Sequence, residues 1–240
     1  MGCPGRDLLG LAVLIVGTAA PAHADWTVAA FLGGGTTART TIELSQPSLG
    51  VELRFEPVDY RGEAFTSPVY YGYRLGYVLP RTPRFAIEAE FVHLKAYTDP
   101  AARVSARGRV GGSAVDRVQV LGDTFERFSI SHGVNFVLAN LVFRQPLDRR
   151  DRVALAVRGG LGPTVPHPES TIGGRSVERY ELGSFGWQIG AGLEVKVAGG
   201  LHAIGEYKLT RTRQRVTVAD GEARTLLRTH HGIFGVGWRF

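Results

Sequence analysis

The chain alternates apolar and polar residues in eight separate stretches. In the clearest one, Phe185 to Val197, aromatic or aliphatic side chains occupy every second position, and Gly, Gln, Glu or Lys lie between them. A period of two places these two sets on opposite faces of a β-strand. Segments of about ten residues with one apolar face are typical of transmembrane β-strands. The eight stretches cover approximately residues 26–35, 69–79, 84–95, 129–144, 152–161, 185–197, 201–210 and 230–240.

The segments between these stretches alternate in length. Short ones follow the even strands, at residues 80–83, 145–151 and 198–200, and long ones follow the odd strands, at roughly 36–68, 96–128, 162–184 and 211–228. Short periplasmic turns and long extracellular loops distinguish an even-stranded outer-membrane barrel. The pattern predicts an all-β fold, an eight-stranded antiparallel up-and-down transmembrane β-barrel. Val51, Leu53 and Phe55 also alternate, so they belong either to a strand extension above the membrane or to a ten-stranded barrel.

The polar faces argue against a soluble sandwich or lipocalin-like barrel, in which the apolar face would point inward. They carry Gly and charges of both signs, as a narrow lumen does, and aromatic residues such as Trp26 and Trp238 lie at strand ends, where membrane girdles fall. An eight-stranded barrel is only wide enough for its own side chains. We therefore expect ion pairs that plug the lumen, not a diffusion pore or a catalytic pair at Glu88 and Glu90.

The two chain ends indicate export to the outer membrane. Arg6 precedes an apolar run from Leu8 to Ala20, and an Ala-x-Ala site ends at Ala24. This is the pattern of a secretory signal peptide, and the run is shorter than the roughly 20 apolar residues of a spanning helix. The sequence thus predicts a cleaved signal peptide at 1–24 and a barrel domain at 25–240. The last strand ends in a phenylalanine, Phe240. It resembles the terminal strands that the barrel assembly machinery recognises in outer-membrane proteins, so we expect that machinery as a partner.

Composition narrows the chemistry. Cleavage removes Cys3, the single cysteine, so disulfides and thiolate metal sites are excluded. The net charge of +6 favours anionic partners, which for an exported chain are lipid headgroups and lipopolysaccharide. No nucleic-acid motif is present, and we expect a monomer.

Histidines gather at the predicted extracellular rim, at positions 93, 132, 167, 230 and 231. Imidazole and carboxylate groups are suitable ligands for a borderline divalent metal ion. His93 continues the outward register of Phe91, so it should face the lipopolysaccharide headgroups unless a bulge intervenes. Ser131 directly precedes His132 and points the other way, which argues against a serine hydrolase.

Four motifs carry a resemblance to a known family. They are Ser67-Pro68-Val69-Tyr70-Tyr71-Gly72-Tyr73-Arg74, Phe91-Val92-His93-Leu94-Lys95-Ala96-Tyr97, Ser131-His132-Gly133-Val134-Asn135 and Pro166-His167-Pro168-Glu169. Together they resemble the outer-membrane barrel family that contains the rhizobial lipid A oxidase, which uses oxygen to convert the proximal glucosamine of lipid A to an aminogluconate. The resemblance implies a divalent metal held by His93, His132, His167 and Glu169, with Lys95, Tyr97 and Asn135 placed to hold a phosphorylated sugar.

Two functions remain open from the sequence. The first is a lipid A-modifying oxidase with a metal site at the rim, and the second is a non-enzymatic barrel whose loops bind or shield the cell surface. The segment 211–228 bears on both functions, because it contains five arginines and only two acidic residues, Asp220 and Glu222. Guanidinium groups pair bidentately with phosphate, so this segment either grips lipid A phosphates or core sugars, or is a solvated charged loop.

Overall fold

The computed structural model describes residues 26–240, so the predicted signal peptide lies outside the described residues. This part of the chain forms a single sheet of fifteen strands and two short 3-10 helices. No helix in it is long and apolar enough to cross a membrane. The elements are β1 (Trp26–Gln46), η1 (Pro47–Leu49), β2 (Val51–Arg61), β3 (Tyr71–Val78), β4 (Phe85–His93), β5 (Ala96–Thr98), β6 (Arg103–Val110), β7 (Ser113–Val120), η2 (Leu121–Asp123), β8 (Arg127–Ile130), β9 (Phe136–Pro146), β10 (Val153–Pro163), β11 (Glu169–Ile172), β12 (Arg175–Glu178), β13 (Phe185–Ala198), β14 (Leu201–Val218) and β15 (Gly221–Arg239).

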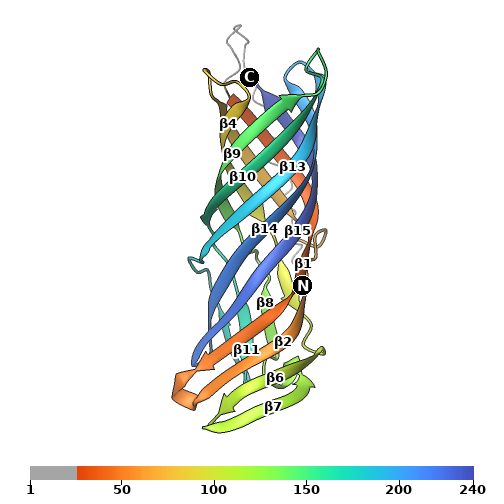
Figure 1. Ribbon diagram of the computed structural model, residues 1–240. Coiled ribbons are helices and arrows are strands. Elements are labelled where there is room, and N and C mark those ends of the chain that lie inside the picture. The colour runs from red at the N-terminus through yellow and green to blue at the C-terminus, as the bar shows by residue number, and fades with distance from the viewer. Residues whose placement is uncertain (1–25) are drawn as a thin grey trace, which may run out of the picture.

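Eight of these strands close into an antiparallel barrel (Figure 1). The order around the wall is β1, β3, β4, β9, β10, β13, β14 and β15, and β15 pairs with β1 to complete the ring. Short turns join β3 to β4, β9 to β10 and β13 to β14 at the end that holds Phe240. The predicted eight-stranded barrel is confirmed, and the ten-stranded alternative is wrong.

The outer face of the barrel is apolar. Side chains such as Leu193, Ile87, Leu141 and Val236 are about half exposed although they belong to the hydrophobic stripes found in the sequence. In a soluble protein such residues would be buried. Their exposure around the whole wall is the arrangement that a lipid bilayer requires.

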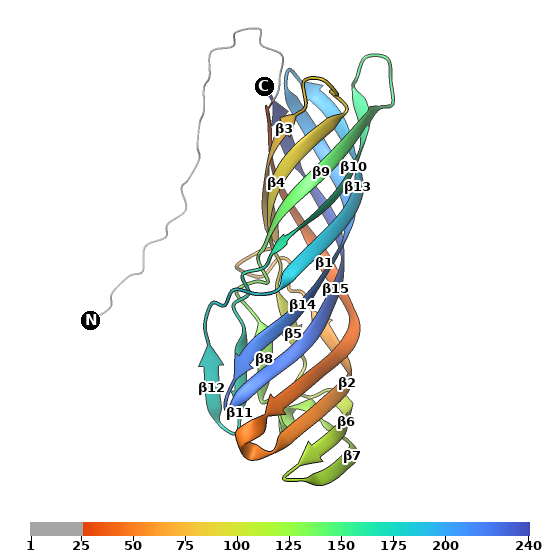
Figure 2. The same cartoon turned by 60° about the vertical axis from the view of Figure 1, so that its left-hand side comes forward.

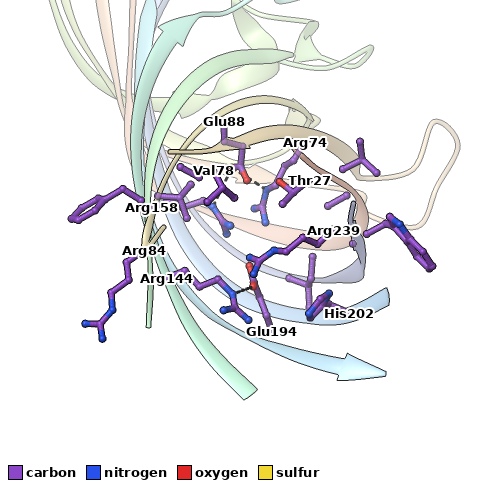
Figure 3. A pocket seen from close by; sticks show the side chains of 18 of the residues that line it. Thr27, Arg74, Val78, Arg84, Glu88, Arg144, Arg158, Glu194, His202 and Arg239 are labelled. Atoms are coloured by element: carbon purple, nitrogen blue, oxygen red, sulfur yellow. Dashed lines mark hydrogen bonds and ion pairs between the residues drawn. The ribbon is translucent and has the colours of Figure 1, made fainter. Parts of the chain in front are cut away.

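The lumen is filled by ion pairs. The guanidinium of Arg74 donates to Glu206 at 2.8 Å and to Glu90 at 3.3 Å, and Lys208 donates to Glu90. A second layer lies toward the Phe240 end, where Arg144 donates to Glu194 at 2.8 Å (Figure 3). Buried charges are stable only when they are paired, so the predicted plug of ion pairs is confirmed, and both Glu88 and Glu90 belong to it.

In the extracellular part of the protein, beyond the membrane-spanning barrel, the outer face is polar and the inner face is apolar, which is the reverse of the barrel. Along β14 the outward side chains change from Tyr207 and Leu209 to Arg211, whereas the inward side chains change from Lys208 to Val216. The interior of this extracellular part is a hydrophobic core that includes Phe55, Phe125, Phe128, Ile42, Leu44, Ile130 and Leu227. The outer part of the chain therefore folds as a water-soluble protein does.

This core is built by strands where the sequence predicted loops (Figure 2). Strand β2 pairs with the C-terminal half of β1, and the sheet continues from β2 to β5, β8, β11 and β12. The segment 211–228 is not a loop, because β14 and β15 run through it and meet at a turn in which Asp220 has φ +57°. Val51, Leu53 and Phe55 belong to the strand extension, the first of the two alternatives considered for them.

The strand predicted at 129–144 is divided into β8 and β9. Gly133 and Asn135 have φ values of +98° and +48°, which a β-strand cannot contain. The interruption separates a membrane strand from an extracellular strand with different neighbours, because β9 pairs with β4 and β10 whereas β8 pairs with β5 and β11. It also places the segment 131–135 at the rim.

Candidate metal centre and lipid-facing groove

The segment 131–135 is fixed between the end of β4 and the segment that follows β10. Backbone N–H groups of Val134, Val165 and His167 donate to the carbonyl groups of Leu94, Asn135 and Gly133, at 2.7, 2.9 and 3.1 Å. Pro166 and Pro168 flank His167 and restrict its backbone. The rim histidines thus come from three distant parts of the sequence and are held by main-chain bonds.

Three of the four predicted metal ligands converge. His132, His167 and Glu169, together with Glu178, each offer one ligand atom, and these four atoms lie within 4.8 Å of one another. The Nδ1 atom of His132 is 3.4 Å from a Glu169 oxygen, and the Nε2 atom of His167 is 3.9 Å from a Glu178 oxygen. The rings of His132 and His167 meet edge to face with centroids 4.6 Å apart.

The donor set fits a divalent metal ion. Bonds of about 2.0–2.2 Å would bring the ligand atoms closer together than they are here, and the side chains of His132 and Glu178 are exposed, so the solvent side leaves room for that movement. The Nδ1 atom of His167 is buried without a hydrogen-bond partner. Glu169 and Glu178 lie directly opposite each other on β11 and β12, where like charges are destabilising; Arg127 pairs with Glu169, and a metal cation between the two carboxylates would add to that compensation.

Glu169 is held from its other side. Arg127 pairs with one of its oxygens at 2.5 Å, and the hydroxyl of Ser131 donates to the other. These contacts fix the carboxylate beside His132 and leave its orientation little freedom. Partners of this kind orient ligands in metal sites.

His93, the fourth predicted ligand, lies outside this cluster. Its ring stacks on Tyr71, its neighbour on β3, with centroids 5.0 Å apart and an interplanar angle of 15°. The predicted outward register is therefore kept, and His93 is buried because the segment 131–135 covers it. A Cβ atom on Gly133 would lie 2.5 Å from the His93 ring, so only glycine fits at that position.

Asn135 determines which ring nitrogen of neutral His93 carries the proton. Its amide NH₂ donates to the carbonyl groups of Val165 and His132 at 2.9 and 3.2 Å, so its oxygen is left to accept from Nδ1 of His93 at 2.8 Å. A neutral imidazole that donates through Nδ1 has a bare acceptor at Nε2. That Nε2 atom is buried and has no partner.

A groove of about 420 Å³ opens beside these residues on the outer side of the barrel. Tyr71 and Phe91 belong to the lipid-facing register of β3 and β4, so the groove is reached from the membrane side and not from the lumen. It is lined by Pro68, Tyr71, Phe91, His93, His132, Asn135, Val165 and Tyr180.

Lys95 and Tyr97 do not line this groove. The ammonium of Lys95 donates to the carbonyl of Thr66 at 3.0 Å and lies 5.5 Å above the Tyr97 ring. The hydroxyl of Tyr97 donates to the carbonyl of Ser131 at 3.4 Å, and burial raises the pKa of Tyr97, with the nearby carboxylates of Glu63 and Glu169 adding to the rise. Tyr97 therefore supports the segment that carries His132, and Lys95 holds the connection between β2 and β3.

Sequence reasoning missed Glu178. The sequence Ile172-Gly173-Gly174-Arg175 is a signal for a two-residue hairpin, and both glycines have positive φ, at +58° and +71°. Pairing residues outward from that turn brings Glu169 opposite Glu178. The hairpin signal was available in the sequence and could have identified this carboxylate.

An apolar outer wall, a charge-filled lumen and short turns at one end define a transmembrane barrel of the outer-membrane type. The chain matches the family described as outer membrane protein beta-barrel domain over residues 9–240, and it belongs to that family. It is a bacterial outer-membrane β-barrel protein.

Solved structures with low sequence identity also match. Neisserial surface protein A is 10% identical, with a TM-score of 0.45 and coverage of 90% of this chain and 97% of that one. Ail, the attachment invasion locus protein of Yersinia pestis, is 13% identical, with a TM-score of 0.38 and coverage of 90% and 99%. No curated protein matches the chain.

Proposed function

We propose that this barrel is a metal-dependent oxidase that acts on the proximal glucosamine of lipid A in the outer leaflet. The observation that carries the proposal is the convergence of His132, His167 and Glu169 beside a groove that opens toward the membrane. Two histidines and one carboxylate are the donor set of non-heme iron(II) oxygenases. When bound, such a metal supplies a centre at which dioxygen is reduced.

The residues of the groove support a reaction at C1 of a sugar with a free hydroxyl there. The C1–H bond and the hydroxyl O–H bond break, a C1=O bond forms, and two electrons and two protons reduce dioxygen to hydrogen peroxide. Hydrolysis of the resulting lactone gives the aminogluconate. Nε2 of His93 is the acceptor for the hydroxyl proton, because Asn135 holds the proton of the ring on Nδ1.

The position of the groove supports a lipid substrate. Tyr71 and Phe91 form its wall on the membrane side, and Tyr180 lies on its extracellular side, with its ring 4.2 Å from that of His167. Acyl chains beside the barrel wall would leave the sugar at the height of the histidines. Lys95 and Tyr97 act in this proposal as positioning residues, through Thr66 and Ser131.

The test combines lipid A mass spectra with a metal analysis. Expression in an outer-membrane host should add one oxygen to lipid A, and the purified protein should contain about one metal ion per chain, as one such site implies. The double variant His132→Ala/His167→Ala should lose both. His230→Ala is the matched control, because His230 is a rim histidine on β15 that bonds Tyr207 and lies outside the cluster.

Unchanged lipid A from a folded protein that binds metal would refute oxidation and leave a metal-binding barrel. A non-enzymatic role would be favoured if the His132→Ala/His167→Ala variant bound metal as well as the wild type and neither protein modified lipid A.

A further inference from the structure

The outer faces of β14 and β15 carry a stripe of arginines directly above the lipid-facing wall. Arg211, Arg213 and Arg228 make up this arginine stripe, and all three are exposed. Within residues 26–240 none of them forms an ion pair, whereas the neighbouring Arg215 and Arg224 share Glu222. The stripe is therefore uncompensated positive charge on a rigid surface.

Its height coincides with the lipid headgroups. Arg211 pairs with Trp187 on β13, whose side chain faces the membrane, and the next outward residue below Arg211 is Leu209. Tryptophan marks the membrane–water interface of such barrels. The guanidinium groups of the stripe begin beside this tryptophan and continue toward the extracellular side, so they lie at the level of the phosphate groups of the outer leaflet.

The strand pairing brings like charges together. Arg211 and Arg228 are directly opposite each other on β14 and β15, an arrangement that destabilises a sheet when nothing lies between the charges. A bound anion converts the repulsion into two charge-assisted pairs, and phosphate suits the planar guanidinium. The opposition of these two arginines is the second observation that points to an anionic ligand.

The surface continues from the stripe to the candidate metal centre. A groove of about 680 Å³ is lined by Arg213 and by the exposed side chain of Leu182. The adjoining surface, at Arg215, includes both Leu182 and Tyr180, and Tyr180 also lines the groove beside His93. One segment, 180–184, thus connects the two regions.

We propose that the arginine stripe is the binding site for the phosphate of the distal sugar of lipid A. The inference rests on the proposed function in one respect: oxidation at C1 requires a free hydroxyl on the proximal sugar, so the phosphate recognised must be on the other sugar. Binding itself needs only the stripe and an outer-leaflet lipid.

The experiment measures lipid binding, not oxidation. Native mass spectrometry of the full barrel in detergent would give affinities for lipid A with phosphate only on the distal sugar, with phosphate only on the proximal sugar, and with none. The variant is Arg211→Gln/Arg213→Gln/Arg228→Gln. The control Arg103→Gln/Arg109→Gln/Arg117→Gln removes the same charge from the β6–β7 hairpin, at the end farthest from the membrane (Figure 2), where these three arginines are exposed and form no ion pair within the described residues, although Arg117 donates a hydrogen bond to Gln119.

The stripe variant should bind the distal phosphate form about a hundredfold more weakly, since each of the three arginines near an anionic lipid surface contributes about a factor of five. The control should change affinity less than about twofold. Equal losses in both variants, equal affinity of the wild type for all three lipids, or displacement of the lipid by an equal concentration of inorganic phosphate would each overturn the proposal.

The two proposals fail separately. In the variant His132→Ala/His167→Ala the lipid with the distal phosphate should still bind more tightly than the lipid without phosphate, by about the same factor as in the wild type, which would show that phosphate recognition survives without the metal centre. If the wild type oxidises lipid A in a metal-dependent way but the stripe variant binds the distal phosphate form as tightly as the wild type, the phosphate site is refuted and the proposed function stands.

Discussion

Replacing Glu90 with Gln removes a negative charge from the centre of the lumen. The Glu90 side chain is fully buried and accepts hydrogen bonds from Lys208, from Arg74 at 3.3 Å and from Asn140 at 2.8 Å. Gln keeps the volume and loses the charge. Lys208, itself fully buried, then has no carboxylate partner.

The expected loss in the free energy of unfolding is about 3–5 kcal/mol, the range for breaking one side of a buried pair. Coulomb attraction supports the same size, because unit charges about 4 Å apart at an effective dielectric constant near 20 attract by about 4 kcal/mol. Asp59→Asn is the control. It breaks the Arg39–Asp59 pair, which is in direct contact at 2.7 Å but whose side chains are 71% and 55% exposed, and it should cost about 0.2–1 kcal/mol.

The assay is urea unfolding of the barrel from phosphatidylcholine vesicles, followed by tryptophan fluorescence. The double variant Glu90→Gln/Lys208→Met removes both charges, and it should recover part of the loss because no unpaired charge remains. The single variant Lys208→Met completes the cycle. The view that this pair is energetically coupled would be refuted by a loss below about 1 kcal/mol for Glu90→Gln, or by a loss in the double variant equal to the sum of the losses in the two single variants.

Three further changes test other levels of the structure. Leu193→Lys places a charge on the lipid-facing wall and should cost about 2–4 kcal/mol in the same unfolding assay, whereas a soluble protein would tolerate it at this half-exposed site. Phe125→Ala should destabilise the extracellular core by about 3–5 kcal/mol, and limited proteolysis should then cut the extracellular strands while the barrel stays intact. Gly133→Ala should displace the His93 ring. Folded protein would still be recovered from the outer membrane, but oxidised lipid A should be absent, and unchanged oxidation would contradict the role given to His93.

The membrane part of the fold could be predicted from the sequence because its pattern is regular. Between Phe185 and Val197 every lipid-facing residue is apolar, and only a closed barrel satisfies the backbone of such strands in a bilayer. The rim position of the histidines could also be predicted from the strand pattern, whereas Glu169 became a candidate ligand only through the resemblance of the motifs. Their actual convergence required the backbone bonds of segment 131–135, which no sequence pattern specifies.

The extracellular strands were missed because the sense of the alternation changes. On β14, positions 211, 213 and 215 continue the outward register of Leu209, but they are arginines, so the apolar stripe ends there. The period of two in fact continues, with Val216 and Val218 now buried on the inner face. A search for apolar-out strands stops at this exchange, although the strand itself continues.

The position of the exchange gives the candidate site its height. Where the outward residues change from apolar to charged, the solvent around the barrel changes from lipid to water. The arginine stripe begins at this boundary on β14. The groove at His93 lies at the corresponding end of β4, where the outward face ends in Phe91 and Tyr71 and extracellular segments begin. A ligand held there would have apolar wall on one side and polar segments on the other, and the proposed lipid A substrate has its first sugars at such a boundary.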